Sequence, residues 1–189
     1  VMSGDKKVSL SIGDEVSEGD RIETDASGKA QILFTSGNQL NLTPNSVIVI
    51  TEVNENETGK DAKKRVVLDL IKGRVRNKVN QSYNGDQSYY RIRTGSAVAG
   101  VRGTDFVVTQ DGDDKITTSK IETLEGTVEL SDAKFEQKAV IAKGEGSSFV
   151  IDKDGKGQLT PVYKMSDEQI AGLQKDTSFS LENSKMVAK

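Results

Sequence analysis

Apolar and polar residues alternate with a period of two through most of the chain, and this pattern predicts β-strands. Turn-forming residues (Gly, Asn, Asp, Ser and Pro) separate the alternating segments. We expect strands over residues 8–12, 21–24, 30–34, 39–42, 46–50, 66–79, 90–94, 105–109, 116–121, 127–130, 139–141 and 148–151. The sequence therefore predicts an all-β fold of about a dozen short strands, and it excludes an α/β nucleotide-binding fold.

A weak internal repeat favours a solenoid-like arrangement, in which successive β-coils twist and stack on one another. The pattern apolar-x-Gly-x-apolar occurs at Ile71–Val75 and again at Leu124–Val128, with a looser copy at Val16–Ile22. Glycine at the start of each strand would suit the corners of stacked coils. Because the same short pattern is common in other β proteins, a sandwich stays open as the alternative.

The C-terminal segment changes character from strand to helix. Ser166 is a suitable N-cap, and Gln169 follows three residues later, which is the spacing of a capping box. This spacing predicts one short helix over residues 167–175. We therefore divide the chain into a β domain at residues 8–160 and a C-terminal helix and tail at residues 161–189, docked or partly disordered.

Composition limits the chemistry that the chain can perform. It has no cysteine and no histidine, so it lacks disulfides, thiol chemistry and the commonest metal ligand and general base. Its carboxylates gather in turns and at strand ends, where solvated acids are expected, and no spacing marks a catalytic pair. We therefore predict that the protein is not an enzyme and that it binds no cofactor and no metal.

Charge and hydropathy restrict the classes of partner and the membrane topology that the sequence allows. The net charge of −3 predicts no nucleic-acid partner, and the low fractions of hydrophobic (34%) and aromatic (5%) residues fit a thin β architecture. No apolar run approaches the roughly 20 residues that span a bilayer. The sequence therefore predicts no transmembrane segment, and it shows no signal peptide.

The segment at residues 91–109 is the most distinctive part of the chain. Two expected strands flank a crossing of small residues at residues 95–100, and Arg102 follows as a full charge in an apolar, glycine-punctuated run. Because an unpaired buried charge is very costly, we expect Arg102 to be structural, largely buried and paired with carbonyls or a carboxylate. The residues of this structural motif are Gly100, Arg102, Gly103, Thr104 and Asp105.

The ten residues at 97–106 (AVAGVRGTDF) resemble the signature of the FecR-like domain, a family named for bacterial ferric citrate regulators. Residues 16–24 resemble the family's opening turn and strand, and residues 28–34 and 37–42 resemble its next two strands. The resemblance covers residues 8–151. It implies an all-β, solenoid-like module on the outer side of a bacterial inner membrane, in the periplasm or cell envelope, that acts by contacting another envelope protein.

FecR-type regulators also carry a cytoplasmic anti-sigma segment, a membrane helix and a further signalling subdomain. This sequence shows none of the three. We therefore expect a stand-alone, signalling-related interaction or scaffolding module, which a lipid anchor upstream of this sequence would hold at the membrane.

One part of the chain is strongly basic. Eleven Lys or Arg residues outnumber three Asp residues within residues 60–102. Because side chains two apart share a face of a strand, this alternation predicts a basic ladder on two consecutive strands. Its residues, our candidate binding face, are Lys72, Arg74, Arg76, Lys78, Tyr89, Arg91 and Arg93.

Two interpretations of this face stay open. It can dock an acidic protein surface or, as an alternative function, an anionic envelope glycan or polymer. It can also be an ordinary outward face that acidic strands carrying Glu122, Glu125 and Glu129 balance within the protein.

Overall fold

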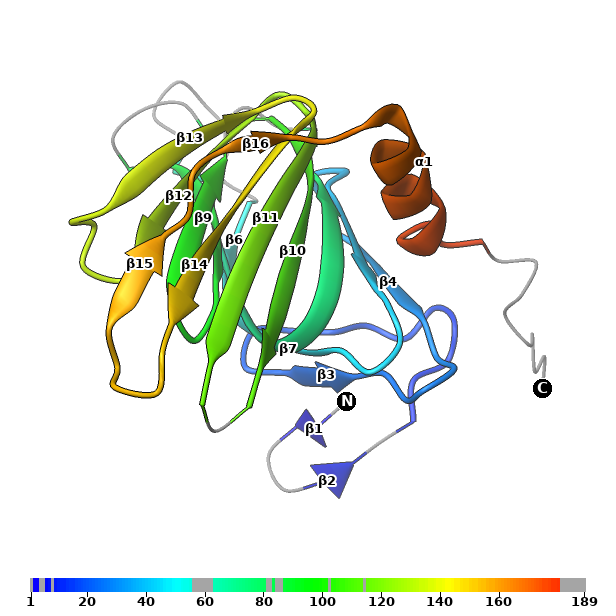
Figure 1. The fold of residues 1–189 in the computed structure, drawn as a ribbon. Coiled ribbons are helices and arrows are strands. Elements are labelled where there is room, and N and C mark those ends of the chain that lie inside the picture. Colours follow the sequence, from blue (N-terminus) through cyan, green and yellow to red (C-terminus); the bar gives the residue numbers. More distant parts are fainter. Residues whose placement is uncertain are drawn as a thin grey trace.

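The computed structural model describes residues 2–3, 6–7, 9–55, 63–80, 83, 87–101, 103–113 and 115–180 (Figure 1). Within this part of the chain the protein is mostly strand, with a single helix near the C-terminus, as predicted. The elements are β1 (Met2–Ser3), β2 (Lys6–Lys7), β3 (Arg21–Glu23), β4 (Ala30–Leu33), β5 (Gln39–Leu42), β6 (Val47–Asn54), β7 (Arg65–Lys78), β8 (Tyr89–Arg93), β9 (Ala97–Val101), β10 (Asp105–Gly112), β11 (Thr117–Glu125), β12 (Thr127–Asp132), β13 (Lys138–Ala142), β14 (Glu145–Ile151), β15 (Gly157–Leu159), β16 (Tyr163–Lys164) and α1 (Asp167–Asp176).

The strands form one curved sheet that folds back on itself and is nearly closed into a barrel (Figure 1). One part, here called the β8 layer, has the order β13-β12-β9-β8-β7-β6-β3. The other, called the β10 layer, has the order β4-β5-β7-β10-β11-β14-β15. The long strand β7 belongs to both layers and holds them together.

β7 changes layer at Gly73. Residues before it pair with β6 and β8, whereas residues from Gly73 onward pair with β10 and β5. Gly73 has a φ of 90°, and a Cβ there would lie 2.6 Å from the Cα of Ser46. Only glycine fits this left-handed, crowded position. The Ser46 hydroxyl secures the bend by accepting from the Arg74 amide at 3.0 Å and donating to the Arg74 carbonyl at 3.1 Å.

The hydrophobic core lies between the two layers. Period-2 alternation sends every second side chain inward, so β8 buries Tyr90 and Ile92 while its other residues face outward. The largest fully buried side chains come from strands of both layers and, in the case of Tyr83, from the connection between β7 and β8: Tyr83, Tyr90, Phe106, Ile22, Leu40, Leu42, Ile48, Leu68, Leu70, Ile92, Ile121 and Leu130.

The solenoid-like arrangement is not what the described strands form. Stacked coils of a solenoid pair in parallel, yet β7 with β8 is the one parallel pair among the described pairings. The two clearest copies of the glycine repeat serve different purposes. Gly73 marks the change of layer, and Gly126, with a φ of 80°, makes the tight turn between β11 and β12. A short pattern with glycine therefore marked sharp bends, which a curved antiparallel sheet needs as much as a solenoid does.

Two local expectations also differ from the structure. Residues 9–12 form no strand, and their apolar residues Leu10 and Ile12 are 40% and 60% exposed, because no neighbouring strand covers them. The expected crossing of small residues is partly a regular strand: β9 pairs with β8 on one side and with β12 on the other. Small side chains there reflect close packing within the sheet.

Helix α1 begins and ends within one residue of its predicted bounds, and the capping box is confirmed. The Ser166 hydroxyl accepts from the Gln169 amide at 3.2 Å, and the Gln169 side chain accepts from the Ser166 amide at 2.8 Å. Leu173 of the helix packs with Met165 just before it against Val107 of β10 and Leu124 of β11. The helix thus covers part of the outer side of the β10 layer, next to β10 and β4 in Figure 1.

Replacing Ser166 with alanine should weaken the start of α1. The substitution leaves the Gln169 amide without its acceptor, and loss of such an N-cap costs about 1 kcal/mol. Hydrogen exchange of the first-turn amides of α1 should accelerate, while exchange in the core strands stays unchanged. A Ser9→Ala variant, at an exposed position outside any element, is the control. Equal exchange in both variants would contradict the capping role.

Candidate binding surface

The kink in β7 separates the predicted basic ladder into two groups. β8 pairs with Arg65–Asp69, so Tyr89, Arg91 and Arg93 do not lie opposite the cations at positions 72–78. The seven residues therefore do not form one continuous ladder. The predicted ladder required the cations at positions 72–78 to pair with β8. Because β7 changes layer at Gly73, the residues from Gly73 onward pair with β10 and β5 instead. Whether either group binds a partner stays a prediction.

The first group is largely engaged within the protein. Arg76 is buried and donates to both carboxylate oxygens of Asp105, from Nε at 2.8 Å and from Nη2 at 2.7 Å. Its Nη1 also donates to the carbonyl of Gln174 at 3.4 Å, near the end of α1. Arg74 donates from Nε to the Thr109 hydroxyl at 3.1 Å. Arg76 is therefore a structural cation.

Lys72 and Lys78 complete this group. Lys72 is exposed and lines an open groove near Gly73, whereas Lys78 is half-buried at the end of β7. They lie at opposite ends of the 72–78 segment, on either side of the two engaged arginines. Neither belongs to the surface that carries Tyr89.

The second group forms a cluster on the outward face of the β8 layer, which we call the Tyr89 patch: Glu52, Arg65, Asp69, Tyr89, Arg91 and Arg93. The Tyr89 hydroxyl donates to Oε2 of Glu52 at 2.9 Å, and Nη1 of Arg65 lies 3.8 Å from Oε1 of the same carboxylate. Burial, followed by the hydrogen bond to Glu52, raises the pKa of the Tyr89 hydroxyl. The ring is therefore held in place by its own hydroxyl.

A bidentate ion pair anchors the other side of the Tyr89 patch. Arg93 donates to Asp69 from Nε at 2.5 Å and from Nη2 at 2.6 Å, and the Thr51 hydroxyl donates to the same carboxylate at 2.8 Å. Burial acts to raise the pKa of Asp69, but the hydrogen bonds from Arg93 and Thr51 outweigh it and hold that pKa below its ordinary value. Asp69 is thus charged at neutral pH and neutralises Arg93.

Arg91 differs from its two arginine neighbours. Its guanidinium carbon lies 4.2 Å from the centre of the Tyr89 ring, a favourable cation–π distance. Within the described part of the chain no carboxylate lies in ion-pair distance of Arg91, whereas Arg65 and Arg93 each have one. The patch therefore presents a guanidinium that is oriented by an aromatic ring and not neutralised.

The motif residues that the structure describes hold neighbouring strands together. Thr104 and Val79 exchange both backbone hydrogen bonds, at 2.9 and 3.0 Å, and the Thr104 hydroxyl donates to the Thr127 carbonyl at 3.1 Å. Asp105 is the partner of Arg76. Gly103 has a φ of 76°, whereas Gly100 lies within β9 and has no such constraint. Arg102 lies outside the described residues, so its burial stays a prediction.

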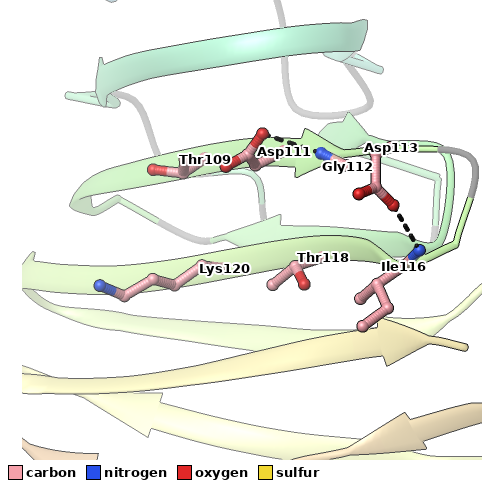
Figure 2. Close-up of a pocket in the computed structure, with 7 residues that line it drawn as sticks. All are labelled: Thr109, Asp111, Gly112, Asp113, Ile116, Thr118 and Lys120. Atoms are coloured by element: carbon pink, nitrogen blue, oxygen red, sulfur yellow. Dashed lines mark hydrogen bonds between the residues drawn. The ribbon is translucent and has the colours of Figure 1, made fainter.

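An open groove of about 430 Å³ runs along the β10–β11 hairpin (Figure 2). Two acidic residues line it, but both secure the turn. Asp111 accepts from the Gly112 amide at 2.9 Å, and Asp113 accepts from the amides of Lys115 and Ile116 at 2.8 and 2.9 Å. Those two backbone hydrogen bonds hold the pKa of Asp113 below its ordinary value. Both carboxylates thus accept hydrogen bonds from backbone amides of their own hairpin.

The described residues show no feature of a metal site or of a membrane-spanning helix. They contain no group of three acidic, histidine or cysteine side chains that would hold a metal ion. None of their helices is both long and apolar enough to cross a membrane. The surface with the most specific organisation is the Tyr89 patch. Sequence reasoning found its outward tyrosine and arginines but missed Glu52, Arg65 and Asp69, because they lie on strands whose pairing has no local signal.

The fold and this patch define an all-β module with an ordered tyrosine–arginine surface. The chain belongs to the FecR family: the family model described as FecR protein matches residues 20–129, which confirms the resemblance seen in the sequence. No curated protein matches the chain.

Solved structures show a similar fold. Two crystal structures of a candidate anti-sigma factor from Parabacteroides distasonis ATCC 8503 align with TM-scores of 0.56 and 0.57, at 14% and 15% sequence identity. Each alignment covers 82% of this chain and 64% of the solved chain, so this chain spans less than two thirds of their length. At this identity the likeness concerns the fold alone.

Proposed function

We propose that the protein is a regulatory interaction module of the bacterial cell envelope, which binds another protein through the Tyr89 patch. It acts by contact and not by catalysis. The observation that carries this proposal is the unneutralised, ring-stacked Arg91 on the outward face of the β8 layer. Tyrosine and arginine are enriched at the energetic centres of protein interfaces, because the tyrosine ring offers a large contact area with few flexible bonds and the arginine guanidinium offers several hydrogen-bond donors.

Membership of the FecR family and the likeness to a candidate anti-sigma factor support a role in signalling. We place the module outside the cytoplasm, as the family resemblance implies, with a lipid anchor upstream as its attachment. Helix α1 covers part of the β10 layer, so that surface is less available to a partner. The β8 layer is the face on which we expect the partner to bind.

A non-enzymatic role has physical support as well. The sequence lacks the two side chains, histidine and cysteine, that most often act as general base or nucleophile near neutral pH. The described carboxylates that line the hairpin groove are held by backbone amides. Asp69 is held by an arginine and a hydroxyl.

Binding of an anionic glycan or polymer is the second candidate function, and the charge on Arg91 favours it. The Tyr89 patch, however, also contains the acidic side chains of Glu52 and Asp69, which oppose the binding of a uniform polyanion. A partner that brings a small number of carboxylates to defined positions avoids this repulsion. For this reason we favour a protein partner.

Capture from envelope extracts tests the proposal. Immobilised wild-type protein and an Arg91→Glu variant are compared by quantitative mass spectrometry of the proteins that they retain. We expect the variant to lose the partner by about tenfold or more, because it reverses a central interface charge. Lys156→Glu, at an exposed turn between β14 and β15, is the matched control and should retain it. Equal capture by all three proteins, or capture of a polymer only, would contradict the proposal.

A further inference from the structure

We propose that the partner presents an extended, acidic segment that lies across β9 at Gly100, with one of its carboxylates bound by Arg91. This inference rests on the proposed function and specifies the part of the partner that the β8 layer recognises. Its basis is the placement of Gly100 within a regular strand, where no described residue gives a reason for a glycine.

Five glycines lie within the described strands, and four of them are explained by their own neighbours. Gly73 combines a positive φ with close contact to Ser46. An added Cβ would lie 2.8 Å from the Ile116 carbonyl at Gly112, 2.5 Å from the Tyr163 hydroxyl at Gly146 and 2.6 Å from the Phe149 ring at Gly157. At each of these positions an added side chain would come too close to a neighbouring residue, so the fold accounts for the glycine.

Gly100 is different in each respect. Its φ is not in the left-handed region, and no described atom lies within 4 Å of an added Cβ. Its pairing is regular, opposite Arg91 on β8 and Glu129 on β12, so it marks no bulge. Glycine inside a strand lowers stability, and where neither a bulge nor a bend requires it, it often marks a place where another backbone approaches closely. The open space above Gly100 is therefore suited to a backbone from outside the chain.

The residues beside Gly100 determine what fits there. Ala99 and Val101 belong to the core, so alternation places Gly100 on the outward face, in one row with Val67, Arg91, Glu129 and Val140. On one side of the gap is the unneutralised guanidinium of Arg91. The Arg91 guanidinium lies over the Tyr89 ring, and a planar guanidinium binds a carboxylate through two parallel hydrogen bonds.

The other side of the gap is compatible with an acidic segment. Glu129 lies there, but Nζ of Lys138 is 3.3 Å from its carboxylate and offsets its charge. Beyond it, Val140 on the edge strand β13 is 63% exposed and offers an apolar contact. Neighbouring strands lie roughly 5 Å apart, so Arg91 and Val140 are separated by roughly 15 Å, a span of four to five extended residues. Residues on one side of an extended segment lie an even number of positions apart, so a segment with an acidic residue and an apolar residue four positions further on matches both ends.

Nuclear magnetic resonance titration of the 15N-labelled 189-residue chain tests this inference. The probe is a synthetic octapeptide with Glu at positions 1 and 3, Val at positions 5 and 7 and Ser elsewhere, compared with the same peptide carrying Gln for Glu and with polyphosphate. We expect the Glu peptide to shift the amide resonances of Arg91, Gly100 and Glu129 and to bind about tenfold more tightly than the Gln peptide, because Gln keeps an acceptor for Arg91 but lacks the negative charge of the ion pair. Equal binding of the two peptides, or the same shifts with polyphosphate, would overturn the inference.

A Gly100→Val variant supplies a steric test. Valine suits a strand and meets no described neighbour, so the melting temperature should stay within about 2 °C of the wild type or rise. Binding of the Glu peptide should fall about tenfold or more, because the side chain occupies the space of the incoming backbone. An Arg91→Gln variant should keep the binding of the Gln peptide and lose the preference for Glu.

The capture assay separates failure of this inference from failure of the proposed function. A protein partner that is lost by Arg91→Glu but fully retained by Gly100→Val would overturn the docking position and leave the proposed function intact. Retention of no protein by the wild type would overturn the proposed function itself, and the inference with it.

Discussion

An Arg76→Met variant should have a free energy of unfolding about 3 kcal/mol lower than the wild type. Arg76 is 8% exposed and forms a two-bond ion pair with Asp105 between adjacent strands β7 and β10. Methionine keeps most of the side chain's apolar length but removes the charge. Asp105 then stays partly buried as an uncompensated carboxylate, which costs about 3–5 kcal/mol in well-buried pairs. We take the lower end of that range because the Asp105 side chain is 21% exposed.

The same substitution at Arg93 provides the control. Arg93 and Asp69 have the same two-bond geometry, but the Arg93 side chain is 45% exposed. When this pair is broken, water can form hydrogen bonds with the exposed groups and offset much of the lost stabilisation. Arg93→Met should therefore cost less than about 1 kcal/mol. Denaturant unfolding at pH 7 measures both variants. Equal losses would show that burial does not decide the strength of these pairs.

Arg76 should also affect the C-terminal helix. Three side chains from the β10 layer side donate to carbonyls at the end of α1 and beyond it: Arg76 to Gln174, Asn41 to Thr177 at 3.2 Å, and Lys29 to Asp176 at 2.9 Å. Cations near a helix C-terminus stabilise it through the helix dipole. In Arg76→Met the amides of α1 should exchange faster, whereas in Arg93→Met they should not change.

The helix and the motif were predictable because their signals are local. Ser166 and Gln169 lie three residues apart, and the capping box that they form depends on no other part of the chain. The FecR signature is likewise one continuous stretch, which the family match over residues 20–129 includes. Strand alternation also identified most strands, since the division into buried and outward faces follows from the period of two.

The arrangement of the basic residues was not predictable, because it depends on contacts between distant segments. Before Gly73 the core residues of β7 are at even positions (Val66, Leu68 and Leu70), whereas Val75 after it is at an odd position. The phase of the alternation therefore shifts at the change of layer, but the alternation of Lys72, Arg74 and Arg76 does not indicate which strands pair on either side of it. Arg76 meets Asp105 and Gln174, which are 29 and 98 residues away in the chain. The sequence therefore indicated the outward face of Tyr89, Arg91 and Arg93 correctly, but it could not show that Arg76 donates to a carboxylate and to a carbonyl near the end of α1.

The second large effect is expected at a buried polar cluster inside the core, formed by Asn38, Glu55 and Tyr83. Asn38 is fully buried, and its Nδ2 donates to Oε1 of Glu55 and to the Tyr83 hydroxyl, both at 2.7 Å. Its Oδ1 accepts from the Asn80 amide at 2.8 Å. The Tyr83 hydroxyl in turn donates to Glu55, and burial together with that hydrogen bond raises the pKa of Tyr83. Asn38 thus connects an acid and a phenol that have little access to water with the half-buried backbone amide of Asn80.

An Asn38→Ala variant should lower the free energy of unfolding by about 2–3 kcal/mol. The substitution removes one donor from the buried carboxylate of Glu55 and leaves the Asn80 amide without its acceptor, and each unsatisfied buried group costs about 1–3 kcal/mol. Asn80→Ala is the matched control, since it removes only an exposed bond from Nδ2 to the Gly37 carbonyl and should cost less than about 1 kcal/mol.

A double-mutant cycle with Tyr83→Phe tests whether the cluster acts as a unit. Tyr83→Phe removes a hydroxyl that both donates to Glu55 and accepts from Asn38, so its effect and that of Asn38→Ala share the same partners. The double variant should therefore lose less stability than the sum of the two single variants, by about 0.5–3 kcal/mol. Strict additivity in denaturant unfolding would show that Asn38 and Tyr83 stabilise the core independently, and it would contradict the role of Asn38 as the connecting residue.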